Sequence, residues 1–218
     1  MIKIDLQFFG GRGSSSSSGR YRGGGGLSED AIKSTTSLIS EREGQQVAVD
    51  EVLQVSSDFL DEFGVTADDW LVAEIDPKAG ALAYAERSGT IGINKDYFGD
   101  GKMENVYADC VAAGFHPSNG NKTALQAVTA HELGHRINGV IANKTGEDFD
   151  SVATKIVKDA RKSTKHRGVV QMSSRISRYA THSNAEAIAE AVSDYYCNGK
   201  KARSESRAIV NTLKSYLK

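Results

Sequence analysis

Apolar residues recur every three to four positions along much of the chain, and this spacing predicts helices. In residues 46–63, for example, Val49, Val52 and Phe59 fall on one face, and Gly64 follows as a C-cap. The same kind of spacing predicts helices at 46–63, 102–113, 123–143, 151–161, 184–197 and 204–217. Most of the chain after residue 45 is therefore expected to be helical.

Three short segments have the pattern of strands instead. Residues 70–75 form a short apolar run, and residues 82–86 and 90–94 flank a turn that contains Gly89. Two such runs around a glycine-bearing turn predict a β-hairpin. Many helices together with a small mixed sheet place the chain in the α+β class.

The helix at 123–143 carries an apolar stripe along one side. The stripe should face the core, and it consists of Ala130, Leu133, Ile137, Val140 and Ile141. Gly134 lies inside the same helix, where glycine is less favourable than alanine by about 1 kcal/mol. We therefore expect the backbone of another element to pass close to Gly134.

The neighbouring face of this helix holds His131, Glu132 and His135, which belong to the run His131-Glu132-Leu133-Gly134-His135 of the form H-E-x-x-H. Two histidines four residues apart on a helix stand one turn apart on one face, so both imidazoles can bind one zinc ion. The intervening Glu132 can then reach a water on that metal. The alternative is a solvated face on which these side chains make only local contacts. The motif and its helical context favour the zinc site.

A third protein ligand has to come from elsewhere in the chain. In the arrangement H-E-x-x-H-x-x-G-x-x-H the chain would need glycine and histidine where it has Asn138 and Ile141. The stretch from Tyr179 to Glu190 resembles the second half of the gluzincin signature, and in particular the lethal-factor-like branch, since Tyr179 precedes Glu186 by seven residues. This resemblance to gluzincin metallopeptidases implies a zincin-like fold, Glu186 as the third zinc ligand, and Tyr179 as a hydrogen-bond donor to the oxyanion.

These assignments have structural alternatives. Ser183 and Glu186 also fit the capping box S-x-x-E, in which the glutamate closes back onto the serine N–H. Tyr179 also fits an ordinary core or surface tyrosine. Glu190 follows Glu186 by one helical turn, and we interpret it as the acceptor for the ring N–H of a ligand histidine. A surface carboxylate and a direct ligand are the alternatives for Glu190.

The other three histidines are assigned outside the metal site. His182 stands four residues before Glu186 and is interpreted as a loop residue, with a position facing the substrate or direct metal ligation as alternatives. His116 and His166 lie in polar, loop-like surroundings, so both side chains are expected to be exposed to solvent.

The composition fits one globular domain with a tail, since the chain has 218 residues, of which 39% are hydrophobic, and a net charge of -1. This charge argues against binding of nucleic acid through bulk electrostatics. The two cysteines, Cys110 and Cys197, form no C-x-x-C pair, so neither a thiolate zinc site nor a disulfide framework is indicated, and one bridge between them stays open. The sequence shows no signal peptide and no apolar run near the roughly 20 residues of a membrane span.

Residues 1–26 differ from the rest of the chain. They are rich in glycine and serine and carry four basic residues and one acidic residue, a net charge of +3. Such a tract is expected to be a disordered linker, so the predicted metallopeptidase domain covers residues 27–218. The opening, Leu6 to Gly13 followed by five serines, resembles the start of minor head and structural proteins of tailed bacteriophages. This resemblance implies a phage context, a location in the host cytoplasm or on the virion, and contacts of the tail with virion proteins.

Together these features predict a zinc metallopeptidase in which Glu132 is the general base and Tyr179 stabilises the oxyanion. Its partner is a protein or peptide substrate, and no specific nucleic acid or membrane partner is expected. An extended substrate is expected to pair with residues 90–94, by analogy with zincin-like folds. The alternative function is a phage structural or adaptor protein whose zinc site is not catalytic.

Overall fold

The fold is known from a computed structural model, which describes residues 45–75 and 80–218; the predicted tail and the predicted domain start at residue 27 lie outside the described residues. The helices are α2 (Gln46–Phe63), α3 (Lys102–Ala112), α4 (Ala124–Thr145), α5 (Phe149–Lys162), α6 (Val169–Ser173), α7 (Asn184–Asn198) and α8 (Ser204–Leu217), with 3-10 turns η2 (Tyr179–Thr181) and η3 (Gly199–Lys201). The six predicted helices are confirmed, with ends that differ by at most two residues. The chain is mainly helical with one small sheet, as the α+β prediction requires.

The sheet of the described residues contains β1 (Asp69–Ala73), β2 (Ala83–Ala85) and β3 (Thr90–Asn94) in the order β1-β3-β2. The predicted hairpin is confirmed, because β2 and β3 pair in antiparallel fashion, while β1 pairs with β3 in parallel fashion. The sheet is therefore mixed, with β3 in the middle. The prediction that a substrate pairs with residues 90–94 is wrong, because both edges of this strand are already hydrogen-bonded to neighbouring strands.

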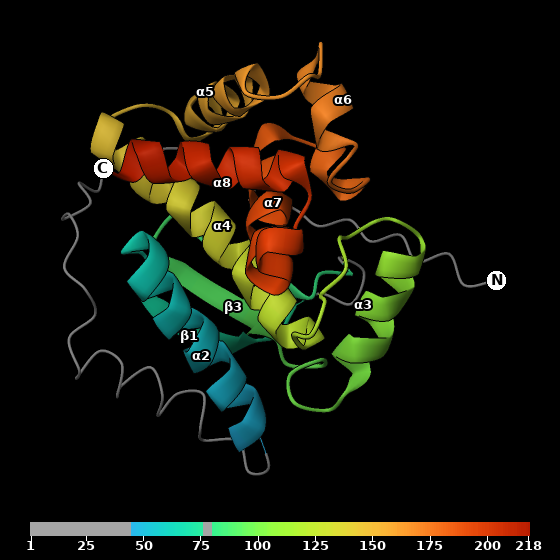
Figure 1. The fold of residues 1–218 in the computed structure, drawn as a ribbon. Coiled ribbons are helices and arrows are strands. Elements are labelled where there is room, and N and C mark those ends of the chain that lie inside the picture. Colours follow the sequence, from blue (N-terminus) through green and yellow to red (C-terminus); the bar gives the residue numbers. More distant parts are fainter. Residues whose placement is uncertain (1–44, 76–79) are drawn as a thin grey trace.

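Helix α4 is the central element of the fold. Figure 1 shows it running between the sheet and α2 on one side and α5 and α8 on the other, and its most extensive contact is with α7. In the predicted apolar stripe, Ala130, Leu133, Ile137 and Ile141 are fully buried, whereas Val140 is half-buried. The burial of apolar side chains in this stripe drives α4 into the core. A long helix held on several sides is a rigid base for side chains that must keep a fixed geometry.

The predicted close approach at Gly134 is confirmed. A Cβ atom at this position would lie 2.7 Å from the Cα of Ala189, which belongs to α7. Only glycine lets the two backbones come this close without moving one of them. The distance between α4 and α7 therefore depends on this residue.

Substituting alanine for the two interior glycines of α4 is expected to change stability in opposite directions. Gly134→Ala should lower the free energy of unfolding by about 1–3 kcal/mol, the usual cost of overpacking. Gly139→Ala should raise it by up to about 1 kcal/mol through helix propensity, because a Cβ at Gly139 would meet only the Phe149 ring, at 4.0 Å. Urea denaturation of both variants measures the two effects. Stabilisation by both substitutions would contradict the packing argument.

No helix of the described residues has the length and apolar character needed to cross a bilayer.

Candidate metal centre

Helices α4 and α7 bring three ligand-type side chains together. The Nε2 atoms of His131 and His135 lie 3.2 and 3.3 Å from Oε2 of Glu186. One ligand atom from each of these residues lies within 4.8 Å of the other two, and the three side chains are largely buried. The group therefore has the composition and spacing to hold one metal ion.

Local capping interactions fix the start of each helix. At the start of α4, Thr123 and Gln126 form a reciprocal capping box. At the start of α7, the Ser183 hydroxyl accepts a hydrogen bond from the backbone N–H of Glu186 at 3.0 Å. The cap and the ligand interpretations of Glu186 are therefore compatible, because its backbone serves the cap while its side chain faces the two histidines.

The charge and hydrogen bonding of Glu186 suit a cation. Its Oε2 atom is buried and has no hydrogen-bond partner among the described residues, although both imidazoles lie close to it. Buried polar atoms without a partner are rare in native proteins. Burial by itself would raise the pKa of Glu186, but the attraction of His135 and His131 outweighs it and lowers the pKa. An anionic oxygen and two imidazole nitrogens that converge in this way fit a metal ion as the missing partner.

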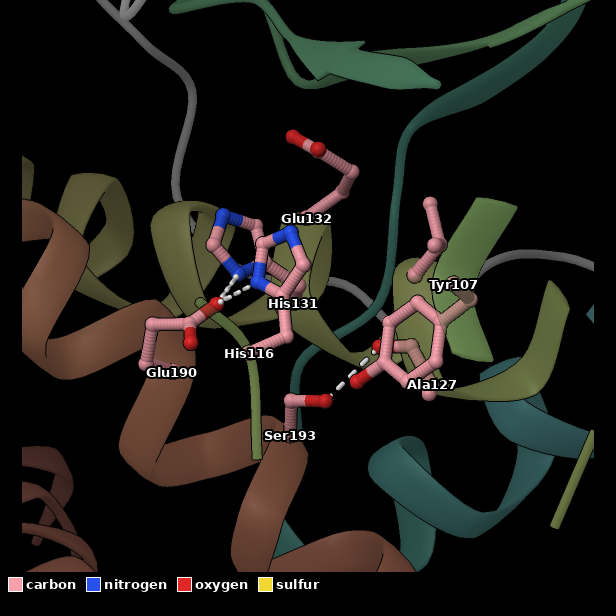
Figure 2. A pocket seen from close by; sticks show the side chains of 8 residues that line it. Tyr107, His116, Ala127, His131, Glu132, Glu190 and Ser193 are labelled. Atoms are coloured by element: carbon pink, nitrogen blue, oxygen red, sulfur yellow. Dashed lines mark hydrogen bonds and ion pairs between the residues drawn. The ribbon is translucent and has the colours of Figure 1, made fainter. Parts of the chain in front are cut away.

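Glu132 lies beside the three candidate ligands. Its side chain is buried, and burial raises the pKa of its carboxyl group. In Figure 2 its carboxylate and that of Glu190 lie on opposite sides of the imidazoles of His116 and His131. A carboxylate with a raised pKa accepts a proton more readily than an ordinary glutamate, which is the property of a general base.

Glu190 is placed as an acceptor for a candidate ligand. Its Oε1 atom lies 2.9 Å from Nδ1 of His131, and the Ser177 hydroxyl donates to Oε2 at 2.6 Å. Because Glu190 is only 1% exposed, the surface alternative is wrong. Burial would raise its pKa, but the attraction and hydrogen bonds of His116 and His131 lower the pKa of Glu190 to about 2. It therefore remains an anion that accepts hydrogen bonds.

The expected exposure of two histidines is wrong. His116 is 6% exposed, because the segment after α3 folds back so that its Nδ1 lies 2.8 Å from Oε1 of Glu190 (Figure 2). His166 is half-buried, and its Nε2 lies 2.6 Å from Oε1 of Glu205. Each histidine is thus held by a carboxylate that lies far from it in the sequence.

Tyr179 stands at the edge of the same group, at the start of η2. It is 1% exposed, and its ring centroid lies 5.9 Å from that of His131. Burial, followed by the negative charge of Glu186, raises the pKa of Tyr179, so the hydroxyl keeps its proton and can donate a hydrogen bond. The exposed ring of His182 contacts Tyr179 at a centroid distance of 4.8 Å.

The sequence interpretation missed His116 and Ser177, which both contact Glu190. His116 lies 74 residues before Glu190 in the chain, and neither residue belongs to a spaced motif. The one local signal was the helical spacing of Glu186 and Glu190, which placed Glu190 near the site without indicating its other partners.

The cysteines do not contribute to this chemistry. Cys110 and Cys197 are free. Burial raises the pKa of Cys110 to about 11 and that of Cys197 to about 12. Both thiols therefore stay protonated at neutral pH, and neither supplies a thiolate ligand or nucleophile.

Comparison with protein-family models, with curated proteins and with solved structures finds no match to this chain. The functional assignment therefore depends on the residues of the site.

Proposed function

We propose that this chain is a zinc-dependent metallopeptidase of the gluzincin type, encoded by a phage or prophage. The observation that carries the proposal is the convergence of His131, His135 and Glu186 on one point, with Glu132 buried beside them. Two histidines and one glutamate are a typical ligand set of catalytic zinc, and three protein ligands leave one position for water or substrate.

In this proposal the residues of the chain have separate roles. Bound zinc supplies a Lewis acid for the scissile carbonyl and lowers the pKa of a water molecule. Glu132 takes the proton of the attacking water and passes it to the leaving amine. The Tyr179 hydroxyl donates to the oxygen that becomes negative in the transition state. Glu190 accepts the Nδ1–H of His131 and so orients its Nε2.

An extended substrate would add to β2, in place of the strand first expected. Leu82 and Glu86 direct their backbone groups to β3, as shown by the hydrogen bonds of Asn94 N to Leu82 O and of Glu86 N to Thr90 O. Backbone groups alternate in direction along an antiparallel strand, so Ala83 and Ala85 face the other way. The sheet of the described residues ends at β2, and β2 contacts α4. This edge therefore suits a peptide that approaches the motif helix.

The second candidate is a phage structural or adaptor protein whose zinc site only stabilises the fold. The burial of the ligands favours it, since the side chains of His131 and Glu186 are only 9% and 8% exposed. The cavity lined by His116, His131, Glu132 and Glu190 has a volume of about 10 Å³, which is room for about one water molecule.

Two measurements on the full chain separate the candidates. Zinc content establishes whether the site binds metal, and digestion of an unbiased peptide library establishes whether the loaded protein cleaves peptide bonds. Bound zinc with cleavage supports the peptidase, bound zinc without cleavage supports the structural role, and failure to bind zinc contradicts both.

A further inference from the structure

His116 is buried beside the candidate metal centre, and neither part of the sequence signature assigns it a role. Its Nδ1 lies 2.8 Å from Oε1 of Glu190, and Nδ1 of His131 lies 2.9 Å from the same oxygen. One carboxylate oxygen therefore joins His116 to a candidate metal ligand. Figure 2 shows both imidazoles directed at this oxygen.

Three side chains together fix the orientation of the Glu190 carboxylate. His116 and His131 share Oε1, and Ser177 donates to Oε2 at 2.6 Å. Glu190 is 1% exposed, so water cannot readily replace a lost donor. Rotation of the carboxylate would break at least one of these hydrogen bonds, so removal of His116 frees the group that orients His131.

His116 is itself held rigidly. Its ring stacks on Tyr107 with a centroid distance of 5.4 Å and an interplanar angle of 3°. The Tyr107 hydroxyl donates to the backbone oxygen of Pro117 at 3.1 Å, which fixes the next residue of the segment. The imidazole is therefore a fixed hydrogen-bonding group and not a mobile side chain.

The segment that carries His116 also holds Tyr179. The backbone N–H of Tyr179 donates to the oxygen of Phe115 at 3.1 Å, and that of Arg178 donates to the oxygen of Gly114 at 2.9 Å. The rings of Phe115 and Tyr179 are in contact, with centroids 5.0 Å apart. The segment 114–116 thus contacts both Glu190, which lies against the candidate ligand His131, and Tyr179.

We propose that His116 is a positioning residue that acts through Glu190. His116 donates to Oε1 and so holds the Glu190 carboxylate in place. In this position the carboxylate accepts the Nδ1–H of His131, which leaves Nε2 of His131 as the metal-binding nitrogen. A hydrogen bond to one ring nitrogen fixes which nitrogen of a histidine is free to bind metal. This inference rests on the proposed function, since it assigns His116 to the same metal site.

A double-mutant cycle on zinc affinity tests the inference. His116→Phe keeps an aromatic ring on Tyr107 and removes the N–H donor, and Glu190→Gln removes the anionic acceptor. Competition with a chromophoric chelator gives the zinc dissociation constant of the full chain. We expect about a tenfold loss for His116→Phe, the lower end of the range for groups that orient a ligand. The double variant should bind zinc as weakly as Glu190→Gln alone, because residues that act in series are not additive.

A second measurement needs no substrate. Imidazole proton–nitrogen correlation spectra of the zinc-loaded protein report the Nδ1 proton of His131, because metal on Nε2 leaves Nδ1 as the protonated nitrogen. In the wild-type chain this proton should exchange slowly with solvent, since Glu190 accepts it, and in His116→Phe it should exchange faster. A purely structural role of His116 would leave this exchange rate unchanged.

His166→Phe is the matched control. It removes the hydrogen bond of a half-buried histidine to a carboxylate, that of Glu205, which joins the connection between α5 and α6 to α8. Zinc affinity should be unchanged in this variant.

Several results would overturn the inference. They are a zinc affinity of His116→Phe equal to that of His166→Phe, additive losses in the double variant, or an unchanged exchange rate of the His131 Nδ1 proton. If His116→Phe does not fold, His116→Leu takes its place with the same expected results. A wild-type chain that binds no zinc would contradict the proposed function itself, which separates the two failures.

Discussion

Glu132→Gln should abolish most peptide hydrolysis and leave zinc binding intact. Loss of a general base costs about 10²–10⁴-fold in rate, and glutamine has nearly the same size as glutamate but cannot take the proton of the attacking water. Glu132 is not among the three converging ligands, so the metal content should not change. We expect this loss in kcat/KM on any peptide that the wild-type chain cleaves, with zinc content measured on the same samples.

Glu62→Gln provides the control for this experiment. Glu62 pairs with Lys214 at 2.7 Å, and its side chain is 36% exposed. This variant loses a carboxylate of the same type away from the candidate ligands and should keep full activity. Retained cleavage by Glu132→Gln would contradict the proposed mechanism, whatever the metal content.

Glu186→Gln should cause the largest loss of zinc affinity. The substitution removes the anionic ligand. Loss of a residue that only orients a ligand typically lowers metal affinity about 10–100-fold, and the loss for Glu186→Gln should exceed this range. Added zinc raises the stability of the folded chain only to the extent that zinc binds to the folded state. We therefore expect the Tm of the wild-type chain to rise with added zinc, and the Tm of Glu186→Gln to be nearly insensitive to it.

Ser183→Ala separates this effect from helix capping. It removes the hydroxyl that accepts from the Glu186 backbone, at a cost of about 1 kcal/mol in stability, and it leaves the Glu186 carboxylate in place. Its Tm should be lower than that of the wild-type chain but should still rise with zinc. An equal loss of zinc response in both variants would show that the response depends on the capped start of α7 and not specifically on the Glu186 carboxylate.

The sequence by itself determined the features that depend on neighbours along the chain. The helix boundaries follow from apolar spacing and caps, and the buried stripe of α4 follows from its period. His131, Glu132 and His135 share one helix, so their mutual geometry is set by the helical turn. The close contact at Gly134 was also predictable, because glycine inside a helix is costly and needs a packing reason.

Only the tertiary structure decided the features that depend on pairing between distant segments. The strand order puts β3 between two partners and leaves β2 at an edge of the sheet. The proposed substrate strand therefore lies beside β2 and not beside β3. The fold of the segment after α3 buried His116 against Glu190, although its sequence has the composition of an exposed loop. Periodicity and capping act over a few residues, whereas these contacts join residues tens of positions apart and form only when the core assembles around α4. The motif thus supplied two of the three candidate metal ligands, and packing decided which other residues lie against them.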